Sequence, residues 1–159
     1  MIDEPFLNRF RHTVDSAAAR LLNVSDAAAA HRPAPGKWSR KEIIGHLIDS
    51  AAHNHVRFVR AQFLDDFVFP GYDQDYWVRV QRYQERPWAD LVRLWQLYNQ
   101  HLASVMATAD PAAVDKPRSP HNLDCIAWQP VPTTEPATLD CFMRDYVGHL
   151  EHHLRQTLG

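Results

Sequence analysis

Two histidines near the C-terminus, His149 and His153, lie four residues apart and carry the clearest chemical signal in the 159-residue chain. In an α-helix this spacing places both imidazoles on one face. Neutral imidazole binds zinc, nickel, copper and iron, so such a pair can hold a divalent ion. The competing interpretation is an ordinary surface or core pair, and His152 offers a second spacing, i to i+3 from His149.

A metal site built on this pair needs a third ligand, and His46 is the best candidate. It lies on a helical strip that mixes polar groups into an otherwise apolar segment, namely Ile43, His46, Ser50, His53 and Arg57. Three protein ligands leave a coordination position for water or substrate, whereas a fourth would indicate a structural metal. The apolar repeat of the last segment includes residues 142, 146, 149 and 153, which favours His153 over His152 as the partner of His149. We therefore predict one divalent metal bound by His46, His149 and His153.

Other polar residues of this region are candidates for the rest of the site. Asp49, three residues after His46, is a candidate catalytic residue that orients an imidazole or acts on a bound water. Asp145, one turn before His149, could support the site in the same way. His53 and Arg57 are candidates for lining the substrate site, where they would receive an anionic substrate. A solvated or interface side chain is the alternative for each of them.

The elements that must position these residues follow from the prolines, because proline breaks a helix interior. Long proline-free windows carry apolar residues at steps of three and four, which is typical of bundle helices. No window alternates with the period of a strand. The pattern predicts an all-α, four-helix bundle with main helices at 5–30, 39–66, 88–109 and 137–157. A short helix or turn is expected within 72–84, and the proline-rich stretch 110–136 predicts a long connection with a little strand or turn.

Local signals support the second and third helices. Ser39 and Glu42 have the spacing of a capping box, in which each side chain bonds a backbone N–H of the first turn. Trp38 is expected to act as a hydrophobic staple beside this cap. Trp88 and Trp95 lie on the apolar stripe of the third helix, so we predict that they pack inside the bundle.

Composition excludes several classes of protein. Lys and Arg number 17 and Asp and Glu 19, so no basic field is present to bind nucleic acid. No apolar run is long enough for a membrane span, and the charged N-terminus is unlike a signal peptide, so we expect a cytoplasmic protein. Cys125 and Cys141 are expected to be free thiols. The chain has no H-E-x-x-H, E-x-x-H, P-loop, G-x-G-x-x-G or G-x-S-x-G motif.

Three segments of the chain resemble the DinB-like superfamily, which includes the YfiT-type proteins and bacterial thiol-dependent transferases and isomerases. The most specific are K-W-S-x-x-E-I-x-G-H-L at 37–47 and H-x-x-H-H-x-x-Q at 149–156, with the stretch 69–102 between them. The resemblance implies a bundle of up-down-down-up topology over residues 1–159. It also implies nickel or zinc bound by three histidines, which fall on His46, His149 and His153.

Together these patterns predict a divalent-metal-dependent enzyme that acts on a small molecule. The reaction would be transfer to a low-molecular-weight thiol, which the resemblance suggests as a second cofactor, or hydrolysis. The alternative is a non-enzymatic bundle with a structural metal, or one that binds a small ligand or a partner. Neither nucleic acid nor membrane is expected as a partner, and a homodimer is left open.

Overall fold

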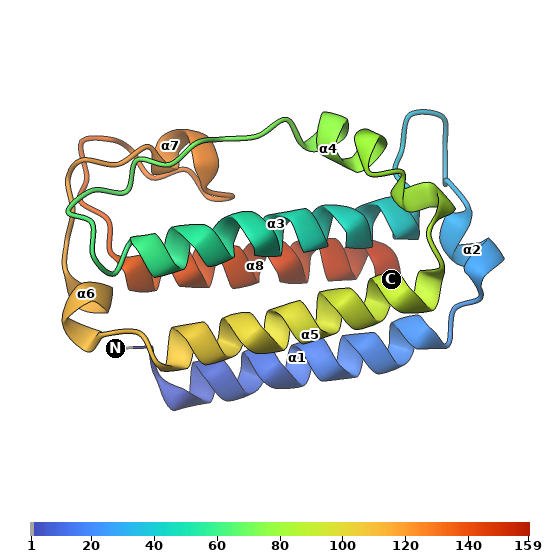
Figure 1. Ribbon diagram of the computed structural model, residues 1–159, viewed down its shortest axis with the longest axis horizontal. Helices are drawn as coiled ribbons and strands as arrows, with labels where there is room; N and C mark the ends of the chain where they lie inside the picture. The colour runs from blue at the N-terminus through green and yellow to red at the C-terminus, as the bar shows by residue number, and fades with distance from the viewer. Residues whose placement is uncertain (1) are drawn as a thin grey trace.

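Four long helices run side by side along the molecule (Figure 1). A computed structural model describes residues 2–159 of the chain. Its long helices are α1 (Glu4–Leu22), α3 (Arg40–Arg60), α5 (Trp88–Ala107) and α8 (Leu139–Leu158). No strand occurs in this part of the chain, which has only two isolated β-bridges. The prediction of an all-α four-helix bundle is confirmed.

The order of helix directions is up-down-down-up, because α1 and α8 point one way and α3 and α5 the other (Figure 1). Two consecutive parallel helices cannot be joined by a tight turn, so the chain after α3 runs back along the whole bundle. This return carries α4 (Gln74–Val80) and the 3₁₀ helix η1 (Tyr83–Glu85), near the predicted position. It covers the side of α3 that carries the polar strip.

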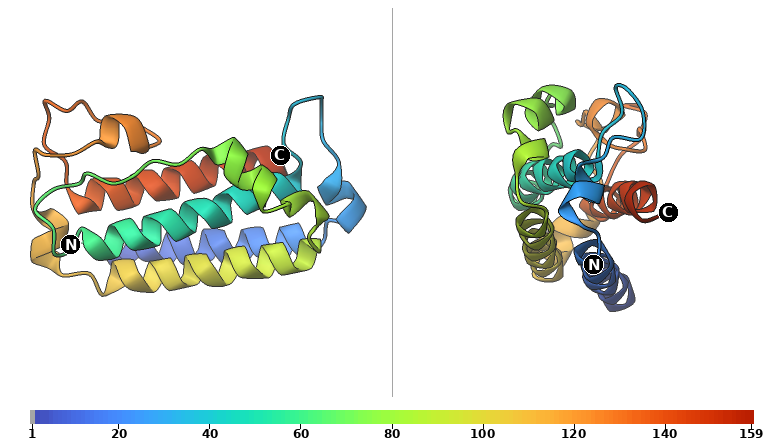
Figure 2. Two further views of the ribbon diagram at one scale, coloured as in Figure 1. Left: turned by 45° about the horizontal axis from the view of Figure 1, so that its top comes forward. Right: turned by 90° about the vertical axis from the view of Figure 1, so that its right-hand side faces the viewer.

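The second long connection, between α5 and α8, is irregular, as its prolines predict. It contains two short helices, α6 (Pro111–Asp115) and α7 (Leu123–Ile126). Single bridges pair Phe67 with His121 and Arg118 with Ala137, which is the small amount of strand expected there. Figure 2 shows that α4 and α7 lie over α3 and α8, away from α1 and α5. Both connections therefore form walls above the groove between α3 and α8.

Two predicted helix boundaries are wrong. The first helix does not continue to residue 30, because α1 ends at Leu22 and a separate α2 (Asp26–Ala30) follows. Ser25 caps this new helix, since its hydroxyl accepts a hydrogen bond from the Ala28 N–H at 3.2 Å. The second helix ends at Arg60 instead of residue 66. Arg118 binds the freed carbonyl of Ala61 at 2.9 Å, and so satisfies this helix end from a distant part of the chain.

The expected cap and core residues hold the long helices in place. Ser39 and Glu42 form the predicted capping box at the start of α3. Trp95 is fully buried and Trp88 is 3% exposed, with the indole N–H of Trp88 donating to the Leu21 carbonyl at 2.8 Å. Trp38 is half-buried, and its ring lies 5.1 Å from the ring of His46. No helix within residues 2–159 is long and apolar enough to cross a membrane.

Candidate metal centre

Three histidines from two helices meet between α3 and α8. One ring nitrogen from each of His46, His149 and His153 lies within 4.8 Å of the other two. The Nε2 atoms of His46 and His149 are 3.3 Å apart. Two nitrogens bound about 2.1 Å from one tetrahedral ion are about 3.4 Å apart, so this separation suits a shared metal. Within residues 2–159, no carboxylate or thiol joins the three imidazoles as a fourth ligand.

Burial keeps these imidazoles in the form that binds metal. His46 is only 1% exposed, and burial together with the neighbouring histidines lowers its pKa to about 3. Burial, His153 and His152 lower the pKa of His149 to about 4. The pKa of His153 is also lowered, mainly by burial and further by His152, while its hydrogen bond to Gln156 opposes the shift. Since a neutral imidazole is the ligand form, all three are ready to coordinate at neutral pH.

Gln156 orients His153 from the next turn of α8. Its Oε1 lies 2.8 Å from His153 Nδ1, so that nitrogen carries the proton and donates it. The other ring nitrogen, Nε2, is then left with a free lone pair for a metal. The amide nitrogen of Gln156 donates in turn to His152 Nε2 at 3.0 Å. His152 is not part of the three-imidazole cluster, although its ring lies 5.3 Å from that of His153, and it packs near Trp128 with ring centroids 5.6 Å apart.

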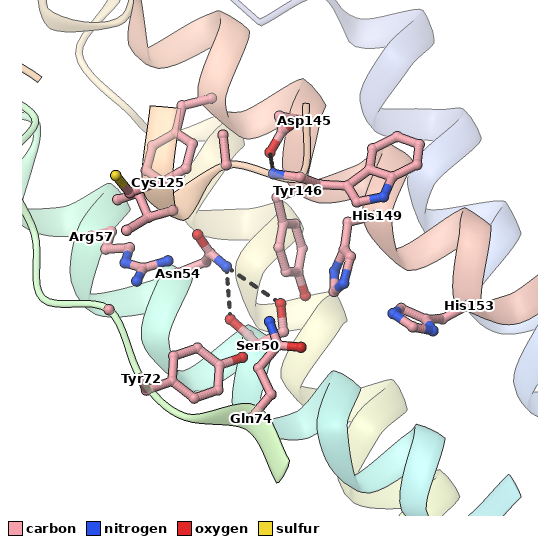
Figure 3. A pocket seen from close by; sticks show the side chains of 15 residues that line it. Ser50, Asn54, Arg57, Tyr72, Gln74, Cys125, Asp145, Tyr146, His149 and His153 are labelled. Atoms are coloured by element: carbon pink, nitrogen blue, oxygen red, sulfur yellow. Dashed lines mark hydrogen bonds between the residues drawn. The ribbon is translucent and has the colours of Figure 1, made fainter. Parts of the chain in front are cut away.

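A cavity of about 390 Å³ opens beside the histidines. His149 and His153 line one end of it, and Arg57 and Tyr72 line the other (Figure 3). Its walls come from α3, α8, the return segment before α4 and the stretch around α7. This volume falls within the range of small-molecule sites. The histidine cluster is thus accessible from a pocket and is not sealed in the core.

Comparison with known proteins fits this arrangement. The family model described as the DinB superfamily matches residues 9–157. The chain belongs to the DinB superfamily. The match confirms the resemblance seen in the sequence motifs. No curated protein matches the chain by sequence.

A solved structure shares the fold of this DinB-superfamily chain. It is the Bacillus subtilis protein YfiT, described as "a probable metal-dependent hydrolase with an unusual four-helix bundle topology". The two superpose with a TM-score of 0.73 over 99% of this chain and 86% of YfiT. Their sequences are 17% identical, so the likeness establishes the topology of the bundle.

Asp49, the predicted catalytic residue, lies under η1 and does not line the cavity. Its Oδ1 accepts hydrogen bonds from the Tyr83 hydroxyl and the Gln81 amide, both at 2.7 Å. The ring of Tyr83 lies so close to α3 that a Cβ on Gly45 would be 2.2 Å from it. These contacts fasten the return segment to α3. Burial raises the pKa of Asp49, and its bonds to Tyr83 and Gln81 oppose the shift. A catalytic role for Asp49 stays a prediction.

Of the two predicted substrate-lining residues, the structure places Arg57 in the cavity wall and His53 outside it. The reason is the return segment, which covers His53. Its ring stacks on Tyr72 at 3.8 Å and meets Trp77 edge-on at 4.5 Å. Its Nδ1 bonds the backbone carbonyl of Asp49 at 2.8 Å. His53 therefore supports Tyr72, which itself lines the cavity.

Asp145 was the other candidate for supporting a metal ligand, and its carboxylate binds backbone instead. Its two oxygens accept the N–H groups of Trp128 and Gln129 at 2.9 and 2.7 Å. Trp128 in turn packs on Gly148, where a Cβ would approach the indole to 3.0 Å. Asp145 thus fixes one wall of the cavity.

Sequence reasoning assigned no role to several residues of the site. Gln156 was visible in the terminal motif, and its spacing of three from His153 was the available signal. Asn54 lies on α3 one helical turn after Ser50, next to the polar strip. Tyr72 and Trp128 come from connections, and no periodicity could place them over the helices.

Proposed function

We propose that this protein is a divalent-metal-dependent enzyme that hydrolyses a small molecule, with His46, His149 and His153 as the metal ligands. The observation that carries the proposal is the meeting of three imidazoles, that of His46 buried and those of His149 and His153 half-buried, at one end of a small-molecule-sized cavity. With no fourth protein ligand among residues 2–159, a metal bound by the three histidines would keep a coordination position for water or substrate. The description of YfiT as a probable metal-dependent hydrolase agrees with it.

A divalent ion held there, nickel or zinc in our proposal, would act as a Lewis acid and lower the pKa of a bound water toward neutrality. The protein's own groups prepare the site for this chemistry. Burial keeps His46 and His149 unprotonated, and Gln156 holds His153 with its free nitrogen available. The walls around Tyr72 and Trp128 shield the cavity and orient a substrate against the histidines.

Transfer to a low-molecular-weight thiol is the second candidate reaction, and one observation favours it. Asp145 is the one carboxylate that lines the cavity, and both of its oxygens already accept backbone N–H groups. These two hydrogen bonds occupy one lone pair on each oxygen and hold the carboxylate to the backbone of the cavity wall, so it is less available as a general base for water. A thiol is more acidic than water, so a metal alone can supply the thiolate nucleophile.

The test is turnover by untagged protein loaded with zinc or nickel. Small esters and amides are offered with and without an added thiol such as cysteine, and both hydrolysis and conjugation are followed by mass spectrometry. Metal-dependent hydrolysis without thiol supports the main proposal, and turnover only with thiol supports the second.

His149→Ala and His152→Ala make a matched pair, because the two residues are neighbours on α8 but only His149 belongs to the cluster. We expect His149→Ala to abolish turnover and His152→Ala to retain most of it. Equal activity in the two variants would contradict the proposal. Stoichiometric metal with no turnover on either reaction would favour a structural metal.

A further inference from the structure

Arg57 is a buried cation that has no counter-ion within residues 2–159. Arg57 is 5% exposed and lines the cavity at the end opposite His153 (Figure 3). In the described part of the chain its guanidinium makes one hydrogen bond, from Nη2 to the Pro70 carbonyl at 2.8 Å. Among the ion pairs of residues 2–159, none involves Arg57. A buried charge is costly unless it is paired, so this arginine is suited to an anionic partner.

Arg118 shows how this fold treats a structural arginine. It is 3% exposed, close to the value for Arg57, and it too has no ion pair in the described chain. Its guanidinium, however, donates to four backbone carbonyls and lies 4.4 Å from the centre of the Phe67 ring. Its charge is therefore compensated by the protein. Arg57 lacks such a set of acceptors, and its remaining N–H groups border a cavity.

Asn54 adds an unused acceptor next to this cation. It is 8% exposed and lines the same cavity, three residues before Arg57 on α3. Its amide nitrogen donates to the Ser50 carbonyl at 2.9 Å, which fixes the orientation of the amide. The Oδ1 atom is buried and has no hydrogen-bond partner among residues 2–159. A ligand that supplies an N–H or O–H would satisfy it.

We propose that this end of the cavity binds the carboxylate of the substrate, with Arg57 pairing the carboxylate and Asn54 Oδ1 accepting from an adjacent N–H or O–H. The substrate class is then a small carboxylic acid with a neighbouring amide, amine or hydroxyl, such as an N-acylated amino acid. The identification of this ligand as a substrate rests on the proposed function, because it places the reacting bond toward His149 and His153.

The charge of the cavity favours a monoanion over a phosphate dianion. Arg57 is the one arginine or lysine in its lining, and the nearby polar groups Ser50, Tyr72 and Gln74 are neutral. Asp145 already adds a negative charge to the wall. A carboxylate pairs with a planar guanidinium through two parallel hydrogen bonds, so a single arginine is enough to bind it.

The experiment measures binding of simple probes, by calorimetry or ligand-observed NMR, to metal-loaded and to chelator-treated protein. N-acetylglycine has a carboxylate and an adjacent N–H, and N-acetylglycinamide is its neutral analogue. Acetoxyacetate keeps the carboxylate but has an ester oxygen in place of the N–H. Inorganic phosphate tests the dianion.

We expect N-acetylglycine to bind at least about tenfold more tightly than N-acetylglycinamide, and more tightly than phosphate. Arg57→Gln should remove this preference, whereas Arg60→Gln should keep it, because Arg60 is exposed on the same helix and lies outside the cavity. Asn54→Leu should remove the preference for N-acetylglycine over acetoxyacetate. The preference for the acid should persist in chelator-treated protein, since Arg57 is not in the histidine cluster.

Equal binding of acid and amide to the wild-type protein would overturn the proposal, and so would tighter binding of phosphate. This comparison needs no variant, so it decides the matter even if Arg57→Gln fails to fold. Unchanged binding in a folded Arg57→Gln protein would also overturn it. Metal content and turnover are measured separately, so a loss of the proposed enzymatic function would not be mistaken for a loss of this subsite.

Discussion

His46 and His149 bridge α3 and α8, while His55 and His101 bridge α3 and α5, and in both pairs the Nε2 atoms are 3.3 Å apart. The rings are also nearly perpendicular in both, at 88° and 87°. The surroundings differ. The inner pair has a third imidazole and a cavity beside it. The outer pair is half-buried at His55 and exposed at His101, with the Tyr98 hydroxyl 3.5 Å from His55 Nδ1.

This comparison shows that the distance between two imidazoles does not define a metal site. At an exposed pair, water competes with a metal ion for the imidazole nitrogens. Such a pair also offers the ion only two ligands. The inner cluster adds the third ligand, the burial that keeps the imidazoles neutral, and a pocket for a reactant. We therefore expect function to follow the inner cluster and to be insensitive to the outer pair.

The largest expected effect is on the stability of the bundle, and it should leave metal binding by the inner cluster unchanged. Trp95 is fully buried on α5 and belongs to neither set of histidines. Trp95→Ala should cost about 3–5 kcal/mol of unfolding free energy, because it leaves a large cavity. Urea unfolding measures the loss, and metal content per folded protein should be unchanged. A loss below about 1 kcal/mol would contradict the core packing described here.

In metal-free protein, the pH dependence of the unfolding free energy should distinguish the inner cluster from the outer pair. The pKa of His46 is lowered to about 3 and that of His149 to about 4, against an ordinary value of 6.5. Below pH 6.5 the unfolded imidazoles take up protons while the folded ones do not, so the unfolding free energy falls as the pH is lowered toward 4. Above pH 6.5 both states are neutral and this contribution is complete.

Urea unfolding in EDTA at pH 7.5, 6 and 5 tests this prediction. His46→Gln should flatten the pH dependence of the unfolding free energy much more than His55→Gln does. In the wild type the pKa of His55 is also lowered, by burial and by His101. An equal change in the two variants would mean that the inner imidazoles are not held neutral by the fold.

Gln156→Ala should weaken the inner site without destroying it. The variant frees the Nδ1 of His153, so the ring loses its fixed orientation. Loss of such a supporting group typically costs 10- to 100-fold in metal affinity. His152→Ala is the matched control, since it removes the other contact of Gln156 and leaves the bond to His153. A competitive chelator titration measures both, and equal affinities would show that Gln156 does not position a ligand.

The smallest effects are expected at the outer pair. His101→Ala removes the 3.3 Å contact with His55, and His55→Ala removes this contact and the 3.5 Å contact with the Tyr98 hydroxyl. Each should change the unfolding free energy by less than about 1 kcal/mol. Thermal unfolding with and without added metal checks this, and the metal-induced rise in the midpoint should be the same as in wild type. A reduced rise would indicate a second metal site at this pair.

Sequence patterns predicted those features of the fold and of the candidate site that depend on a single helix. The capping box at Ser39, the burial of Trp88 and Trp95, and the common helix face of His149 and His153 all follow from spacing along one element. A break such as the one after Leu22 depends on a local competition between caps, which the apolar pattern does not reveal.

Features that depend on the connections were out of reach of such patterns. Whether His53 or Arg57 faces a cavity is decided by where the return segment crosses α3. The partners of Asp49 and Asp145 lie 32 and 17 residues away along the chain, in segments without periodicity. The walls of the site could therefore be described only once the up-down-down-up path was known.

The most direct test of the account is the metal content of untagged protein, measured by elemental analysis after exhaustive desalting. We predict about one nickel or zinc ion per chain in the wild type and in the His55→Ala, His101→Ala and His152→Ala variants. His46→Ala, His149→Ala and His153→Ala should each lose the ion while remaining folded by circular dichroism. Retention of stoichiometric metal in all three of these variants, or its loss in the His55→Ala and His101→Ala variants, would contradict the central claim that the inner cluster is the metal site.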